Sequence, residues 1–155
     1  MANWQVPVVS QRTPRLCWEA CGRMMWLWRY RRNTVMQSLY AQRAGNYATM
    51  NQGLSEQQMD IFYRRLGLRS LGRPSGRNVR HALGWSPVIV TSIRQTFGHA
   101  MLVVGHNGGR YTIVNPCLVQ TVDFGPQGVN TCTAGTRSMS DTVIEADLGQ
   151  YIWYW

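Results

Sequence analysis

Apolar residues recur at helical spacing through the first half of the chain. Between Leu16 and about Tyr30 they fall at Cys17, Cys21, Met24 and Trp28. This period predicts a helix with one largely buried face. The segment ends in the basic run RYRR, and cations are favourable near the negative end of a helix dipole.

Three further helices are predicted from capping residues that favour a helix start and glycines that end a helix. Thr34–Arg43 is a candidate that stops at Gly45, and Ser55 begins another with the capping pattern S-E-Q-Q, which Gly67 ends. Ser75–Leu83 is a short fourth candidate with a serine cap.

The pattern then changes to short β-branched runs separated by turn residues, which predicts strands. The runs are PVIVTSI (87–93), HAMLVVG (99–105), YTIVN (111–115) and TVIEA (142–146), followed by the tail YIWYW (151–155), expected as an edge strand. We therefore predict an α+β fold in a single domain, residues 1–155. A helical half, about 1–84, packs on an antiparallel sheet half, about 85–155.

The charge of the chain is concentrated in the helical half. All 16 basic residues are arginines, and 13 of them lie between Arg12 and Arg80. This bias indicates either a solvated surface or a docking face for an acidic macromolecule. No apolar run reaches the length of a membrane span, and the N-terminus lacks the plan of a signal peptide. We therefore expect no membrane insertion and no use of the general secretory route.

The cysteines do not indicate a disulfide scaffold or a zinc site. Cys17 and Cys21 lack a second closely spaced pair, so structural zinc is not expected. Cys117 and Cys132 form a disulfide only in an oxidising compartment, and their pairing stays open. The sequence predicts no metal and no other cofactor.

Cys17 stands where an activated thiol belongs. A helix N-terminus favours the thiolate through its exposed N–H groups and dipole, although the same position also suits a small core residue. Gln11, on the loop six residues upstream, has an amide that can join the Cys17 N–H as an oxyanion donor.

Three histidines compete for the role of base. His81 is expected on a solvated helix face, and His106, in the turn HNGG, is expected to point to water. His99 begins an apolar strand. A three-residue hairpin loop at 106–108 would set His99 directly opposite Asn115, whose amide would orient the imidazole.

These residues resemble the papain-like cysteine peptidases. The resemblance rests on Q-x5-C-W at a helix start, G-H-A before a strand, and an asparagine sixteen residues after that histidine. It implies a papain-like fold with a buried nucleophile helix. It also implies Cys17 as nucleophile, His99 as general base and acid, Asn115 as its orienter and Gln11 as oxyanion donor.

Two departures point to the small bacterial members of this group. His99 follows Cys17 by only 82 residues, and Pro116-Cys117 replaces the Ser-Trp-Gly of papain-type enzymes. The small members include leader peptidases that cut after paired glycines, and injected effector proteases. The expected function is therefore a secreted effector or toxin protease that cleaves a protein in the cytoplasm of a target cell.

The alternatives keep or replace this chemistry. One is a cell-wall amidase, deamidase or acyltransferase on the same fold. The other is a catalytically silent module that binds nucleic acid, which is disfavoured because the tryptophans fall in core-like stripes. The protease predicts a protein or peptide substrate and a cognate immunity protein in the producer, and an acidic immunity protein would suit the arginines.

Overall fold

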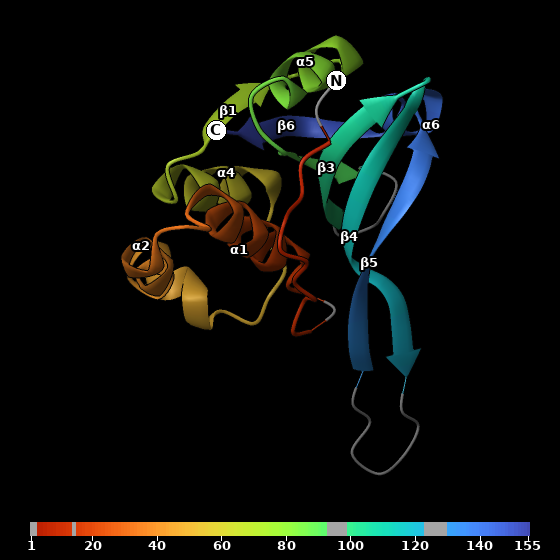
Figure 1. The fold of residues 1–155 in the computed structure, drawn as a ribbon. Helices are drawn as coiled ribbons and strands as arrows, with labels where there is room; N and C mark the ends of the chain where they lie inside the picture. The colour runs from red at the N-terminus through yellow and green to blue at the C-terminus, as the bar shows by residue number, and fades with distance from the viewer. Residues whose placement is uncertain (1–2, 14, 93–98, 123–129) are drawn as a thin grey trace.

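The computed structural model describes residues 3–13, 15–92, 99–122 and 130–155, and they form an antiparallel sheet with helices on both faces (Figure 1). The strands are β1 (Arg69–Gly72), β2 (Val88–Ser92), β3 (His99–Asn107), β4 (Arg110–Val122), β5 (Asn130–Ser140) and β6 (Leu148–Tyr154), in the order β1-β6-β2-β3-β4-β5. The helices are α1 (Cys17–Arg29), α2 (Thr34–Ser38), α3 (Tyr40–Ala44), α4 (Glu56–Arg65), α5 (Gly76–Leu83) and α6 (Asp141–Glu145), with a 3-10 turn η1 at Gly45–Thr49. Within these described ranges, no helix combines the length and apolar character needed to cross a membrane.

The predicted helices form, and their caps explain where they start. Helix α1 begins at Cys17, as expected. Ser55 and Ser75 each cap the helix that follows through a reciprocal capping box, in which side chain and backbone bond to each other at both positions. The helix predicted over Thr34–Arg43 is divided at Leu39 into α2 and α3.

The sheet differs from its prediction at several points. The segment Thr142–Ala146, predicted as a strand, lies mostly in helix α6, because the Ser140 side chain caps that helix at the Val143 N–H. The tail does form a strand, but it is not an edge strand: β6 lies between β1 and β2. Strands β1 and β5 were not predicted. Of the run at 87–93, Ile93 lies outside the described residues.

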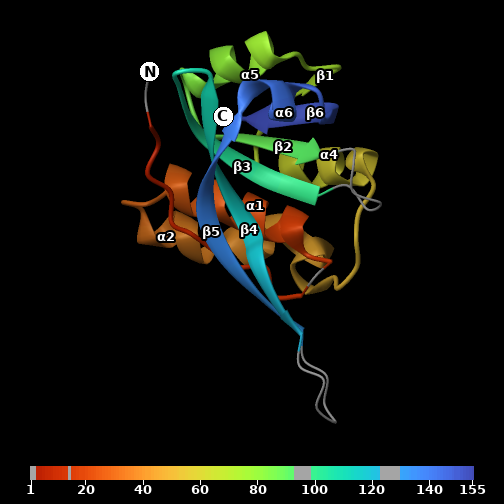
Figure 2. The same cartoon turned by 90° about the vertical axis from the view of Figure 1, so that its right-hand side faces the viewer.

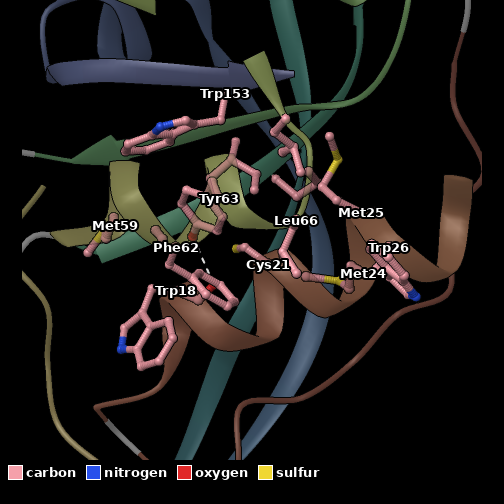
Figure 3. Close-up of a cluster of buried hydrophobic side chains, with 14 of the residues drawn as sticks. Trp18, Cys21, Met24, Met25, Trp26, Met59, Phe62, Tyr63, Leu66 and Trp153 are labelled. Carbon is pink, nitrogen blue, oxygen red and sulfur yellow. Dashed lines mark hydrogen bonds between the residues drawn. The ribbon is translucent and has the colours of Figure 1, made fainter. Parts of the chain in front are cut away.

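Two apolar cores lie on opposite faces of the sheet. The first joins α1 and α4 to the sheet through residues such as Trp18, Phe62, Leu102 and Trp153 (Figure 3). The second joins α5 and α6 to the other face. Strand β2 contributes to both, and all its residues are buried, as expected of a strand covered on both sides.

Helix α1 is held firmly in the first core, with its first residue against the sheet. The Tyr63 hydroxyl of α4 donates a hydrogen bond of 2.8 Å to the Trp18 carbonyl (Figure 3). A Cβ on Gly22 would stand only 2.7 Å from a ring carbon of Phe62, so α1 and α4 approach closely there. This packing fixes where the N-terminus of α1 meets strands β3 and β4 (Figure 2).

The β3–β4 hairpin has a shorter turn than predicted. The loop is not His106–Gly108 but two residues, Gly108 and Gly109, with φ of 56° and 73°, between paired Asn107 and Arg110. Two successive residues with positive φ suit the tight turns that match the twist of a hairpin. Such an even loop, by itself, would place His99 and Asn115 on opposite faces of the sheet.

A bulge in β3 restores the common face. The register shifts by one residue at Val104, and Leu102 then pairs with Val114. Continued to the start of β3, this register places His99 diagonally from Asn115, two residues from direct opposition and on the same face. The extra residue that was expected in the turn is therefore present in strand β3, as the bulge at Val104.

Candidate active site

Cys17 lies where helix α1 meets the start of strand β3. Its side chain is 7% exposed, and its Sγ accepts a hydrogen bond from the Ala100 N–H at 3.3 Å. Because Ala100 follows His99 directly, this bond joins the thiol to the backbone that carries the imidazole. Burial raises the pKa of the Cys17 thiol, whereas the N–H groups of Ala100, Trp18 and Cys17 itself lower it.

His99 and Asn115 are hydrogen-bonded across the hairpin. His99 Nε2 lies 2.7 Å from Asn115 Oδ1, and the Cys117 N–H donates to the same Oδ1 at 2.9 Å. Since a backbone N–H requires an acceptor, this atom of Asn115 is the amide oxygen. His99 must then donate through Nε2–H, which leaves the lone pair of a neutral imidazole on Nδ1.

The state of the imidazole follows from its half-buried position. Desolvation lowers the pKa of His99, and the hydrogen bond to Asn115 raises it by less. The direction of the net shift is downward from 6.5, so His99 is neutral at pH 7. A neutral ring with Nδ1 unprotonated can accept a proton.

Gln11 is a buried residue on the loop before α1, beside the same segment of β4. It is 4% exposed, and its backbone N–H donates to the Pro116 carbonyl at 3.0 Å. Its Nε2 donates to the Thr13 carbonyl at 2.8 Å, which uses one of the two amide hydrogens. Within the described residues its Oε1 is buried without a hydrogen-bond partner.

The loop that carries Gln11 is tied to the helical side by its next residues. The Thr13 hydroxyl donates to Asn51 Oδ1 at 2.8 Å. The Arg12 guanidinium lies 3.9 Å from the carboxylate of Glu19, a 1% exposed residue in the first turn of α1 that also pairs with Arg23 at 2.5 Å. The loop therefore bridges β4 and helix α1.

The other histidines stand apart from this cluster. His81 is exposed, as expected, with its ring edge-on to Trp85. The expectation that His106 points to water is wrong: its side chain is 12% exposed, and Nε2 lies 2.8 Å from Asp141 Oδ1. Among the residues that the structure places, no group of three or more His, Cys, Asp or Glu side chains could hold a metal ion.

Two features of the site were not predicted from the sequence. The Cys117 N–H fixes the Asn115 amide, and a disulfide joins Cys117 to Cys132. The unusual Pro116-Cys117 after the asparagine was a visible signal, but only coordinates show what these residues contact. Cys17 and Cys21 lie outside this disulfide and are buried as thiols.

The arrangement contains the parts of a thiol-dependent acyl transfer. A thiol at a helix N-terminus, an oriented neutral imidazole and amide donors on a nearby loop serve that chemistry.

Comparison with known proteins agrees with this chemistry. The structure is similar to that of the peptidase domain of Streptococcus ComA, a bi-functional ABC transporter involved in a quorum-sensing pathway, with a TM-score of 0.59. The identity is 17%, and the alignment covers 97% of this chain and 96% of that one, so the likeness shows a shared papain-like fold. No curated protein matches. The family model of the papain-like cysteine protease AvrRpt2 matches residues 1–123, and the chain therefore belongs to this family of papain-like cysteine proteases.

Proposed function

We propose that the chain is an endopeptidase that cleaves protein substrates with Cys17 as nucleophile and His99 as general base and acid. The observation that supports this most is the shared Asn115 oxygen. It accepts from the Cys117 N–H at 2.9 Å and lies 2.7 Å from His99 Nε2, which leaves Nδ1 as the proton acceptor. The bond from Ala100 to the Cys17 sulfur holds the thiol at the same strand end.

In the proposed reaction, the Cys17 thiol gives its proton to His99 Nδ1 as the sulfur attacks the scissile carbonyl carbon. The tetrahedral intermediate collapses, and the leaving amine takes the proton from His99, which leaves a thioester on Cys17. Water then attacks the thioester and gives a proton to His99. Release of the carboxylic acid returns that proton to the sulfur.

Gln11 would stabilise the developing oxyanion together with the Cys17 N–H. One Nε2 hydrogen is used by the Thr13 carbonyl, and the other remains for the substrate oxygen. Gln11 and Cys17 are both buried, and hydrogen-bond donors shielded from water stabilise an oxyanion more strongly than donors in water.

We further propose that the protease is a secreted effector or toxin domain. Support comes from its resemblance to the small bacterial papain-like proteases and from its net charge of +9. Sequence reasoning favoured the cytoplasm of a target cell, whereas the Cys117–Cys132 disulfide favours an oxidising compartment, because cytoplasmic thiols stay reduced.

An acidic immunity protein would find its counterpart in a cluster of exposed arginines, here named the arginine pole. Its members lie at or just beyond the C-terminal ends of α1, α3 and α4: Arg29, Arg31, Arg32, Arg43, Arg64 and Arg65. Asp60 pairs with Arg64 at 3.7 Å and is the one acid in an ion pair with the pole within the described ranges. Arg43 and Arg65 line a cavity of about 410 Å³ with Leu39 and Gln42.

The arginine pole lies far from the Cys17 thiol. This distance determines how large a partner must be to contact both. Helix α1 has 13 residues, so about 18 Å separates its two ends. A partner that docks on the pole and also covers Cys17 must be a macromolecule. Arginine favours carboxylates because its guanidinium binds them through two parallel hydrogen bonds.

The nucleophile assignment predicts that Cys17→Ala abolishes cleavage of fluorescein-labelled casein, whereas Cys21→Ala retains it. In the folded protein, iodoacetamide should alkylate Cys17 much faster than Cys21, which is fully buried with a thiol pKa raised well above its usual value. Peptide mass spectrometry measures both sites. Equal labelling of the two thiols, or undiminished cleavage by Cys17→Ala, would contradict the assignment.

Three substitutions should separate the remaining roles. We expect His99→Ala to lower kcat by about 10²–10⁴-fold and Gln11→Ala by about 10²-fold, with KM little changed for Gln11→Ala, since an oxyanion donor acts chiefly in the transition state.

Asn115→Ala should lower kcat less than His99→Ala does, because water can partly replace the amide. It should also move the acid limb of the pH profile further down, since the Asn115 hydrogen bond raises the pKa of His99. An unmoved acid limb, or a change in KM alone for Gln11→Ala, would refute the corresponding role.

The arginine pole predicts local, salt-sensitive binding of acidic polypeptides. Labelled poly-L-glutamate should bind the triple variant Arg31→Gln/Arg32→Gln/Arg65→Gln about tenfold more weakly than the wild type, at up to about 1 kcal/mol per exposed charge. Fluorescence anisotropy at low ionic strength measures this. The matched control Arg73→Gln/Arg77→Gln/Arg137→Gln changes three exposed arginines elsewhere and should have little effect. Equal losses in both variants, or a preference for single-stranded DNA, would exclude this docking face.

A further inference from the structure

The ladder between β4 and β5 is broken next to Asn115. Asn115 pairs with Gly135, but the next pair is Val119 with Thr133, so residues 116–118 of β4 face a single residue of β5. Pro116, within the break, has no N–H to donate. The regular register of the β4–β5 ladder is therefore interrupted at the segment that follows Asn115.

Three backbone groups at this break bond to the candidate active site and the loop before it. The Cys117 N–H donates to Asn115 Oδ1 at 2.9 Å, and the Pro116 carbonyl accepts from the Gln11 N–H at 3.0 Å. On β5, the Ala134 N–H donates to the Ser10 hydroxyl at 2.9 Å. One short segment therefore sets the amide of Asn115 and the loop of Gln11 together.

A disulfide from Cys117 to Cys132 crosses this break. It joins β4 and β5 covalently at the point where the register of their ladder shifts. Both cysteines are half-buried, so each has some access to solvent. Small thiols in the solvent can therefore approach these two residues.

We propose that the Cys117–Cys132 disulfide is a redox switch of the protease: it holds residues 115–117 in the geometry that orients His99 and Gln11, and its reduction turns activity down. The inference rests on the proposed function of Cys17, His99 and Asn115. Cys117 is a positioning residue here, because its N–H acts on His99 through the Asn115 amide.

The switch is a thiol–disulfide exchange with a low-molecular-weight thiol such as glutathione. Two thiols each supply one electron and one proton, the Cys117–Cys132 bond breaks to give two protein thiols, and the two small thiols leave as their disulfide. The reducing cytoplasm of a producing cell would keep the enzyme in the reduced, weakly active form. After export, exchange with a small disulfide such as oxidised glutathione would re-form the Cys117–Cys132 bond, release two molecules of the small thiol and activate the enzyme.

The test compares three forms of the protein: the oxidised wild type, the reduced wild type, and the double variant Cys117→Ser/Cys132→Ser. The reduced wild type is desalted under exclusion of oxygen to remove the reductant. In each form we measure the rates of Cys17 alkylation and of casein cleavage. Cys17 and Cys21 lie in the tryptic peptide of residues 16–23, where fragmentation distinguishes them. We expect reduction or the double substitution to lower both rates at pH 7 by about tenfold or more, as a displaced base would. The acid limb of residual activity should also move to lower pH, which loss of folded protein alone would not cause.

Two controls guard against loss of fold and side effects of the reductant. Reoxidation of the wild type with oxidised glutathione should restore both rates, and the reductant should leave the double serine variant unchanged. If reduction and the double substitution each leave the Cys17 alkylation rate within about twofold, the switch is refuted and the proposed function stands. If the oxidised wild type neither cleaves casein nor alkylates Cys17 faster than Cys21, the proposed function fails, and this inference fails with it.

Discussion

The amide oxygen of Asn115 is the point on which the site depends. It accepts from the backbone of its own strand at Cys117 and from His99 on the neighbouring strand. The first bond identifies the atom as oxygen, and the second follows as a donation from His99 Nε2. The tautomer of the imidazole is therefore fixed by a backbone N–H rather than by another side chain.

Burial opposes the charged forms of the two groups that we propose as nucleophile and base. It raises the pKa of the Cys17 thiol and lowers the pKa of the His99 imidazole, so the two directions favour a neutral pair in the resting protein. The backbone N–H groups around the sulfur act in the opposite sense and lower the cost of forming the thiolate. Proton transfer would then accompany substrate attack.

The elements that depend on interactions between residues close in the sequence could be predicted from the sequence. The serine caps at Ser55 and Ser75 and the helix that starts at Cys17 depend on neighbouring residues, and all three were predicted. Segment 142–146 was assigned to a strand from its β-branched residues alone, whereas the Ser140 side chain caps a helix there. The inner position of β6 depends on β1, a four-residue strand with little pattern of its own.

The pairing of His99 with Asn115 shows the limit of such reasoning. The common face was predicted through an odd loop, but the turn is even and the odd residue is the bulge at Val104. A bulge within an apolar strand leaves no clear mark in the sequence, whereas Gly-Gly marks the turn. The Cys117–Cys132 pairing was left open because it needs the register of β5, which no local pattern gives.

The orientation of His99 can be measured directly by nitrogen-15 NMR of labelled histidine in Cys17→Ala, which removes the thiol as a competing acid. At pH values above the lowered pKa of the imidazole, we expect a proton on Nε2 and none on Nδ1. This is the tautomer that the Asn115 oxygen requires. A proton on Nδ1, with Nε2 bare, would contradict the assignment of His99 as the base that faces Cys17.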